Sequence, residues 1–553
     1  MVLLSIHDGH NASAALFKDG VLLAAVSEER INRKKFFWGW PVRSIDFVLA
    51  DSNIGAHEID VVCVSHMSWI QYAKRKLSSA STYAIQRPKI VLGNFYNIWQ
   101  AFIKERAVRS FQKKYCPNAV LFFCDHHRAH AASAFFCSGY TESLVVTCDN
   151  LGDSYSHTAY SVKDGIWNLA VVGDTNESLG AFYGAVTEGL GFKPNQHEGK
   201  LVGLAAYAAS SVLIERMKKD FARTTKGGLH FKRTPYKKMV TTVKSLIQEG
   251  YTKEEIAAGA QGLLEEIMLE HVGVLLTKYP HTSICVAGGV FANVKLNQRI
   301  KDRFNVSIFI QPAMGDEGLV LGAAWQYMSE TTSNFEGVGP LRHMYLGTHY
   351  TRADIMSVVE NNSLYQIEPF TSYEQTADLL ANGEIIGVFD GRMEFGPRAL
   401  GARSIVVDPR DKKVNDLLNM RLQRSDFMPF APSVLSEYAD ALFQNVEHAR
   451  HAAEFMTITF DVKHEWQKKI PAIVHVDGTA RPQLVRKDRN QSYWMLIHAF
   501  YEKTGIPLIM NTSFNMHEEP IVSSPQDALR SLETGAVDSI LFNYEFFVRL
   551  RKK

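Results

Sequence analysis

The strongest constraint on the fold is a pattern of apolar runs and turns that occurs twice. The first copy, "VLLSIHDGHNASAALFKDGVLLAAVSEER", begins at residue 2, and the second, "LVVTCDNLGDSYSHTAYSVKDGIWNLAVV", begins at residue 144. In both copies the first apolar run ends near an aspartate, Asp8 or Asp149, and a Lys-Asp-Gly turn separates the next two runs. This order predicts strand, loop, strand, turn and strand in each copy.

A duplicated lobe of this kind is typical of sugar kinases, actin and heat-shock ATPases, which hold a nucleotide in the cleft between their lobes. β-Meanders with Lys-Asp-Gly turns are also common, so the repeat alone leaves a simple meander open. Between the copies, residues 68–114 are expected to be helical, and more helices are expected up to about residue 280.

Two later segments predict a strand that leads through a glycine-containing loop into a helix. "SICVAGGVFANVKLNQRI" begins at residue 283, and "VSIFIQPAMGDEGLVLGAAW" begins at residue 306. Glycines let the backbone approach a ligand closely, and a helix N-terminus presents N–H groups to it. A second α/β unit is expected in the last third of the chain. Because 553 residues exceed what one core organises, we predict domains 1–345 and 346–553.

The charge balance and the apolar runs exclude several classes of protein. Lys and Arg (60) nearly balance Asp and Glu (58), and there is no reason to expect nucleic acid or an anionic membrane as the main partner. No apolar run reaches the length of a membrane span, and the N-terminus lacks the features of a signal peptide. The six cysteines include no CxxC pair, as expected of reduced, buried thiols in a cytoplasmic protein.

A candidate metal site begins in the stretch "CDHHRAHAASAFF". His126 and His130 are four residues apart, so a helix would present both imidazoles on one face, the spacing of a pair of metal ligands. A polar helix start with solvated histidines is the simpler alternative. Asp149 and Asp316, each expected at the end of a strand, are candidate oxygen ligands, although spacing alone does not join them to the histidines. A His2Asp2 site with open positions suits Fe(II) or Mn(II) better than structural zinc.

A resemblance to a known family adds to these predictions. Nine motifs occur in order across almost the full chain: "GHNASAAL", "SEERINRKK", "HHRAHAASAFF", "GGVFANV", "GDEGLVLGAA", "GRMEFGPRALGARSI", "PFAPSVL", "HVDGTARPQ" and "NTSFN". Together they resemble the ATP-dependent O-carbamoyltransferases, a family that includes tobramycin, nodulation-factor and cephamycin carbamoyltransferases. The resemblance implies an N-terminal actin-like (ASKHA) nucleotide-cleft domain similar to the tRNA threonylcarbamoyl transferase subunit. It also implies a C-terminal α/β domain similar to threonylcarbamoyl-adenylate synthase.

The family resemblance also implies a reaction. Carbamoyl phosphate is hydrolysed to carbamate in the C-terminal domain, and carbamate attacks the α-phosphate of ATP to give carbamoyl adenylate and pyrophosphate. The N-terminal domain then transfers the carbamoyl group to a hydroxyl of a small molecule or sugar. His10 corresponds to the proposed catalytic base, because a near-neutral imidazole can take the hydroxyl proton. Without the resemblance it would be a turn residue. Asp8 is expected to hold the acceptor.

The remaining site residues follow the same resemblance. The divalent metal, with Fe(II) favoured over Mn or Mg, would bind His126, His130, Asp149 and Asp316, leaving His127 behind the ligands or facing solvent. The expected ATP contacts are Lys35, Gly288, Gly289, Asn293 and Gly318. The expected carbamoyl phosphate contacts are Arg398, Arg403, Arg424, Arg481, Asn511 and Ser513. A guanidinium can bind phosphate oxygens bidentately, although each arginine alone would be more typical of a surface ion pair.

One departure affects the carbamoyl phosphate pocket. Met428 stands where many family members carry an arginine before "PFAP", so Arg421 and Arg424 are the candidates to supply the missing charge. The alternatives to carbamoyl transfer are an actin-like small-molecule kinase, a tRNA threonylcarbamoyl-modifying enzyme and a non-catalytic nucleotide-binding regulator. The acceptor and a homodimeric state are left open. The aromatic segments "KKFFWGW" and "NFYNIWQAF" could line a sugar or polycyclic site, while core packing is the simpler role for most of these rings.

Overall fold

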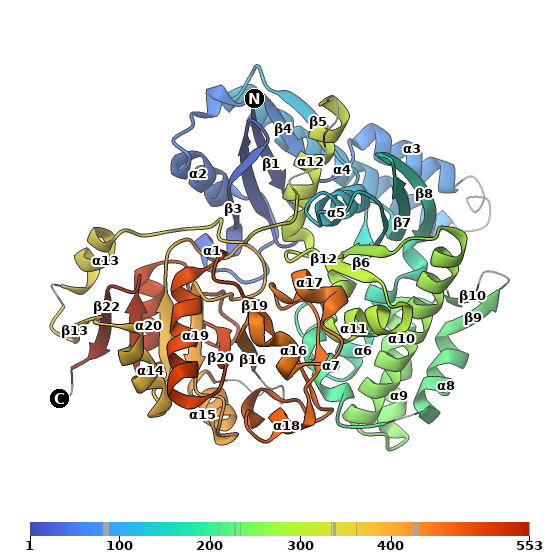
Figure 1. Ribbon diagram of the computed structural model, residues 1–553. Helices are drawn as coiled ribbons and strands as arrows, with labels where there is room; N and C mark the ends of the chain where they lie inside the picture. Colours follow the sequence, from blue (N-terminus) through green and yellow to red (C-terminus); the bar gives the residue numbers. More distant parts are fainter. Residues whose placement is uncertain are drawn as a thin grey trace.

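A computed structural model describes residues 1–80, 88–209, 211–225, 228–232, 234–332, 335, 339–360, 362–423 and 430–551. Figure 1 shows two neighbouring β-sheets in the N-terminal part and a third sheet in the C-terminal part, with helices packed around them. The predicted α/β class is confirmed, and each of the three large sheets combines parallel and antiparallel strands.

The first sheet contains five strands in the order β3-β2-β1-β4-β5. β1 pairs antiparallel with β2 and parallel with β4, so the sheet is mixed. Every residue of β1 is buried, because helices lie on both faces of the sheet, which favours continuous apolar runs. The elements are β1 (Val2–His7), β2 (Ser13–Lys18), β3 (Val21–Ser27), α1 (Glu28–Asn32), α2 (Val42–Asp51), β4 (Val61–Val64), α3 (Trp69–Ala80), α4 (Pro88–Tyr115) and β5 (Val120–Phe123).

The second sheet repeats this topology with later strands, in the order β12-β11-β6-β7-β8. β6 pairs antiparallel with β7 and parallel with β11, as β1 does with β2 and β4. The duplicated lobe predicted from the sequence repeat is therefore confirmed. The elements are α5 (His126–Phe135), β6 (Ser143–Gly152), β7 (Tyr155–Lys163), β8 (Ile166–Asp174), β11 (Ser283–Ala287) and β12 (Ser307–Ile310).

Two helices join the lobes. α5 packs on the second sheet, α12 packs on the first sheet, and the two helices pack against each other. Their approach depends on Gly322, because a Cβ at this position would lie 1.8 Å from the carbonyl oxygen of Ala129. The remaining helices and a short hairpin complete the second lobe: α6 (Leu179–Gly189), α7 (Glu198–Ala205), α8 (Ser211–Phe221), β9 (Ala222–Thr225), β10 (Gly228–Phe231), α9 (Tyr236–Gln248), α10 (Lys253–Lys278), α11 (Val294–Phe304) and α12 (Leu319–Thr331).

The C-terminal part is built on an eight-stranded mixed sheet, in the order β13-β22-β21-β14-β15-β20-β16-β19. Its strands are β13 (Tyr365–Pro369), β14 (Ile386–Phe389), β15 (Arg403–Val407), β16 (Ala431–Leu435), β19 (Gln483–Val485), β20 (Leu508–Ser513), β21 (Ser539–Phe542) and β22 (Phe546–Leu550), with a separate pair β17 (Phe460–Asp461) and β18 (Thr479–Ala480). Its helices are α13 (Arg352–Val359), α14 (Tyr373–Ala381), α15 (Lys413–Arg421), α16 (Ala439–Leu442), α17 (Arg450–Ala453), α18 (His464–Gln467), α19 (Gln491–Thr504) and α20 (Pro525–Glu533).

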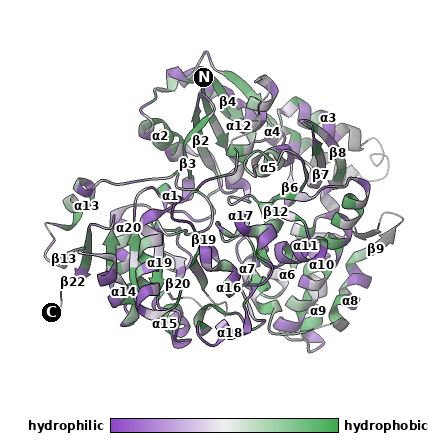
Figure 2. Ribbon diagram, viewed as in Figure 1, coloured by the Kyte–Doolittle hydropathy of each residue, from purple (hydrophilic) through white to green (hydrophobic). Residues whose placement is uncertain are grey.

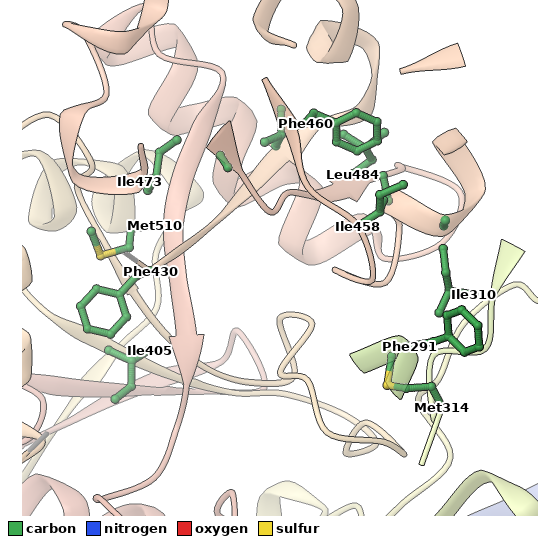
Figure 3. Packing of buried hydrophobic residues seen from close by; sticks show 14 of the residues in the cluster. Phe291, Ile310, Met314, Ile405, Phe430, Ile458, Phe460, Ile473, Leu484 and Met510 are labelled. Atoms are coloured by element: carbon green, nitrogen blue, oxygen red, sulfur yellow. The ribbon is translucent and has the colours of Figure 1, made fainter. Parts of the chain in front are cut away.

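One apolar cluster continues from the second lobe into the C-terminal part. Figure 3 shows Phe291, Ile310 and Met314 of the lobe near Ile458 and Leu484 of the C-terminal part. Figure 2 shows hydrophobic strands within the sheets and hydrophilic residues along α11, which faces the other part. Polar contacts cross the same junction, including an ion pair of 2.7 Å between Lys295 and Asp477. The two parts therefore share a packed interface.

Two further observations bear on the sequence predictions. All six cysteines are buried and free, as the absence of paired spacings indicated. Among the described helices, none combines the length and the apolar character that a membrane span requires. The domain boundary near residue 345 stays a prediction. The segment around it pairs with the C-terminal part, since the Leu346 N–H donates to the carbonyl oxygen of Met393 at 3.2 Å.

Candidate metal centre and anion site

The first turn of α5 sets the position of the two predicted histidine ligands. Asp125 caps the helix, its side chain accepting the Arg128 N–H at 2.9 Å. His126 and His130 then lie one turn apart, with ring centroids separated by 4.8 Å. Both are buried. The capping residue therefore fixes the helix start, and the helix period brings the imidazoles together.

Asp149 and Asp316 meet these histidines from two other elements. Asp149 lies within β6 rather than at its end, and Asp316 follows β12 in a short helical turn. Nε2 of His130 lies 3.2 Å from Asp149 Oδ2 and 3.6 Å from Asp316 Oδ1, and the corresponding distances from His126 are both 3.5 Å. One ligand atom from each residue lies within 4.8 Å of the others. The structure thus joins the four residues that spacing could not join.

The donor set fits a divalent cation. Burial would lower the pKa of His126, but the carboxylates of Asp316 and Asp149 raise it to about 9. Burial would likewise raise the pKa of Asp149, but the two histidines hold it well below its usual range. Two carboxylates that lie close together in a buried cluster repel each other and therefore need positive charge nearby. Protons on the histidines or a metal ion can supply it.

This competition predicts that metal binding releases protons. Since each ligating imidazole must be neutral and the pKa values of His126 and His130 are both raised, the affinity for Mn(II) should increase by about ten- to a hundredfold per pH unit below these pKa values and level off above about pH 9. Titration of metal-depleted protein by calorimetry between pH 6 and pH 10 measures this. His130→Ala should lose the site, whereas His57→Asn, at an exposed position in the first lobe, should retain it. A pH-independent affinity, or an unchanged metal content in His130→Ala, would contradict the site.

Three predicted ATP-contacting glycines lie beside this cluster or in the loop that carries it. Gly288 has φ +104°, and a Cβ there would lie 2.3 Å from the Cys148 carbonyl oxygen, so glycine is required. A Cβ on Gly289 would lie 3.0 Å from Asp149 Oδ1. Gly318 packs against the carbonyl oxygen of Ala313. These glycines let the backbone approach the cluster closely.

The other two predicted ATP contacts are placed differently. Asn293 is buried and caps α11: its Oδ1 accepts the Leu296 N–H at 3.0 Å, and its Nδ2 donates to Gln261 at 2.8 Å. Lys35 is exposed in the loop after α1, with Nζ 5.5 Å from the centre of the Phe36 ring. Their contacts to a nucleotide stay predictions.

The predicted base, His10, lies in the loop between β1 and β2. Phe36 stacks on its ring with centroids 6.0 Å apart, and Trp38 meets its edge at the same distance. The carbonyl oxygen of His10 is within hydrogen-bond distance (3.0 Å) of Nε2 of His7, a nitrogen that lies 3.8 Å from Asp316 Oδ2. His7 thus links the loop of the predicted base to a metal ligand.

Sequence reasoning missed His7 and Glu317. Glu317 holds the same loop, its Oε2 accepting the Asn11 side-chain N–H at 3.3 Å and its backbone oxygen accepting the Ser13 hydroxyl at 2.9 Å. Both residues lie inside or beside the quoted motifs. They were missed because His7 lies at the end of an apolar run that predicts a strand, and Glu317 directly follows Asp316, the stronger candidate ligand. His127, expected behind the ligands or in solvent, is buried, with its ring nitrogens 2.8 Å from Thr147 Oγ1 and 3.1 Å from the Tyr155 carbonyl oxygen.

Two predicted phosphate ligands of the C-terminal part are half-buried cations that form no ion pair with a described carboxylate. The Nε atoms of Arg398 and Arg481 are buried without a hydrogen-bond partner. No ion pair joins either residue to a carboxylate in the described part of the chain, although the charge of Glu317 reaches Arg398. Burial lowers the pKa of Arg398 to about 10, and burial together with the charge of Arg398 lowers the pKa of Arg481. Such a pair favours a bound anion.

Arg403 has a different environment. It is fully buried, lies over the Phe389 ring, and donates hydrogen bonds to the backbone carbonyl oxygens of Thr348, Asp390, Gly391 and Ala402. These bonds occupy both terminal nitrogens of its guanidinium. We therefore remove Arg403 from the candidate phosphate contacts.

The remaining predicted contacts of this pocket divide into two groups. Asn511 is buried in β20, where its Nδ2 lies 3.0 Å from Ser433 Oγ and its Oδ1 has no hydrogen-bond partner. Ser513 pairs with Ser404 across the sheet. The predictions for Arg424 and for the substitution at Met428 lie outside the described residues, and Arg421 forms an ion pair with Asp538 at 2.7 Å.

A cavity of about 450 Å³ lies between the second lobe and the C-terminal part. Residues of α7, α10 and α11 line one side, and Arg481 and Asp477 lie on the other. Its volume is in the range of small-molecule sites. The anion site predicted around Arg481 therefore opens toward the second lobe, which also carries Asp149 and Asp316.

These features define a two-lobed α/β protein with a His2Asp2 centre between the lobes and a cationic pocket in an attached C-terminal unit. Residues 3–325 match the family model described as carbamoyltransferase N-terminus, and residues 377–549 match the model described as carbamoyltransferase C-terminus. The chain belongs to the carbamoyltransferase family and is a carbamoyltransferase enzyme.

The chain is also similar to other proteins over much of its length. The chain is 32% identical to protein MJ1051 of Methanocaldococcus jannaschii over 98% of its own length and 99% of the relative. It is also 32% identical to the nodulation protein NolNO of Sinorhizobium fredii, covering 96% of this chain and 78% of that protein. Among solved structures, full-length HypF in its phosphate- and nucleotide-bound form matches 60% of the chain at 10% identity, with a TM-score of 0.38.

Proposed function

We propose that the enzyme makes carbamoyl adenylate from carbamoyl phosphate and ATP and transfers the carbamoyl group to a hydroxyl of a small molecule or sugar. The observation that carries this proposal is the division of charge: two half-buried arginines without an ion pair to a described carboxylate in one part, and a His2Asp2 centre in the other. The first suits a phosphate ester, and the second suits a metal–nucleotide complex. The kinase and tRNA-modifying alternatives are not favoured by the family assignment.

The proposed reaction consists of hydrolysis, adenylation and transfer. Hydrolysis of carbamoyl phosphate in the pocket of Arg398 and Arg481 gives carbamate and phosphate, and a carbamate oxygen displaces pyrophosphate from ATP. The acceptor hydroxyl then attacks the carbamoyl carbon, AMP leaves, and His10 takes the hydroxyl proton. His126, His130, Asp149 and Asp316 would hold a divalent cation, Fe(II) or Mn(II), which supplies Lewis-acid charge to nucleotide phosphates.

In the proposed mechanism the C-terminal part forms carbamoyl adenylate, as a unit of the threonylcarbamoyl-adenylate synthase type. The actin-like part then transfers the carbamoyl group. Residues 1–345 and 346–553 are the proposed domains. In this arrangement Asn511 Oδ1, which has no partner, can accept an N–H of the carbamoyl group, and the glycines at 288 and 289 admit nucleotide phosphates.

Product analysis tests the proposal. Purified enzyme with ATP, carbamoyl phosphate and Mn(II) should release pyrophosphate, and adding an acceptor should yield AMP and an acceptor heavier by one carbamoyl group in mass spectrometry. Omitting carbamoyl phosphate is the control and should stop pyrophosphate release. Formation of ADP instead of AMP would support phosphoryl transfer and exclude this mechanism.

A further inference from the structure

The carboxylate of Asp8, expected to hold the acceptor, is already neutralised by the protein. Lys104 of α4 places Nζ 3.4 Å from Asp8 Oδ1, and His66 places Nε2 3.5 Å from the same oxygen. Asp8 is 7% exposed, whereas the Lys104 side chain is 36% exposed. A ligand that approaches from solvent therefore meets the ammonium of Lys104 before it meets the carboxylate.

The predicted base has an exposed aromatic ring beside it. The loop that follows α1 runs along the His10 loop, with the Ala12 N–H donating to the Phe37 carbonyl oxygen and the Gly39 N–H donating to the Gly9 carbonyl oxygen. This pairing holds Trp38 against the edge of His10 while leaving the indole 70% exposed. An exposed indole at a polar site is suited to stack on the apolar face of a sugar ring.

Other charges near this region add no site for a cation. The carboxyl group of Glu198 interacts electrostatically with His10. Its Oε1 already accepts the Asn195 N–H at 2.6 Å, and burial raises the pKa of Glu198. Asp149 and Asp316 belong to the metal cluster. Each of these carboxyl groups thus already has a partner within the protein.

Resting on the proposed function, we propose that the acceptor is a sugar that carries no positive charge next to its reacting hydroxyl, and that Lys104 is the residue that excludes cationic acceptors. Trp38 binds the ring, and Lys104 repels an ammonium group while tolerating a hydroxyl or a carboxylate. Aminated sugars such as aminoglycosides are then poor acceptors for this enzyme.

The test uses three methyl glycosides with one common ring: methyl glucoside, methyl 2-amino-2-deoxyglucoside and methyl glucuronide. Each is offered with ATP, carbamoyl phosphate and Mn(II), and carbamoylated product is measured by mass spectrometry. The neutral and acidic glycosides should react about tenfold faster than the amine, since like charges a few ångströms apart at a surface repel by this order. Lys104→Met should remove this preference or reverse it, because Asp8 is then free to bind the amine.

Lys113→Met, at an exposed lysine on the same helix, is the matched control and should keep the wild-type preference. Pyrophosphate release is measured in the same reactions, because it depends on folding and on the adenylation step. If the wild type released no pyrophosphate, the proposed function would be refuted rather than the acceptor class. With pyrophosphate release intact, three results overturn the inference: no carbamoylated glycoside, a wild-type preference for the amine, or an unchanged preference in Lys104→Met. Trp38→Ala should lower product from all three glycosides equally, and Trp38→Phe should restore it.

Discussion

Arg481→Met is expected to reduce carbamoyl adenylate formation by about a hundredfold or more, as for the loss of one partner from a buried charge pair, roughly 3–5 kcal/mol. The same substitution is expected to raise the midpoint of thermal unfolding. A half-buried guanidinium beside Arg398, whose buried Nε has no hydrogen-bond partner among the described residues, destabilises the folded protein until an anion binds, and methionine fills similar space without the charge. Pyrophosphate release and thermal unfolding measure the two effects, while ATP binding should be largely unchanged.

Phosphate separates this explanation from misfolding. Millimolar inorganic phosphate should stabilise the wild type by binding only the folded state, and it should not stabilise Arg481→Met. Arg403→Met is the contrasting control, because it leaves buried carbonyl oxygens without donors, each at a cost of about 1–3 kcal/mol, and should lower the unfolding midpoint. Normal adenylate yield from Arg481→Met, or an unfolding midpoint that falls as it does in Arg403→Met, would contradict the anion site.

His10→Asn is expected to slow carbamoyl transfer by roughly 10²–10⁴-fold, the contribution of a positioned general base. Pyrophosphate release from ATP and carbamoyl phosphate should continue at the wild-type rate, because neither reactant loses the hydroxyl proton in that step. Asparagine keeps a polar side chain between Phe36 and Trp38, so the loop has a substitute for the imidazole ring. The assay follows pyrophosphate and carbamoylated acceptor side by side.

His57→Asn provides the control for this prediction, since it is an exposed histidine in the same lobe. It should leave both rates unchanged. Equal loss of pyrophosphate release and transfer in His10→Asn would assign His10 to nucleotide binding or folding. If neither rate changed, His10 would be the turn residue that an isolated histidine in a Gly/Asn/Ser loop suggests.

Local sequence signals were enough to predict several elements of the fold and the site. The two Lys-Asp-Gly units predicted two lobes, and both sheets have the same strand order. The spacing of His126 and His130 predicted one helix face, because the helix period is a property of the backbone. The nine ordered motifs predicted the family.

The contacts between distant groups, and the partners of each buried charge, depend on the tertiary structure. Lys104 is 96 residues from Asp8, and nothing in either segment indicates that the ammonium neutralises the carboxylate. Arg403 and Arg481 look alike in sequence, yet both terminal nitrogens of the first guanidinium donate to backbone carbonyl oxygens, whereas no described carboxylate forms an ion pair with the second, which lies near the like charge of Arg398. Burial makes such contacts decisive, since a charge removed from water depends on its few neighbours, and chain folding selects those neighbours.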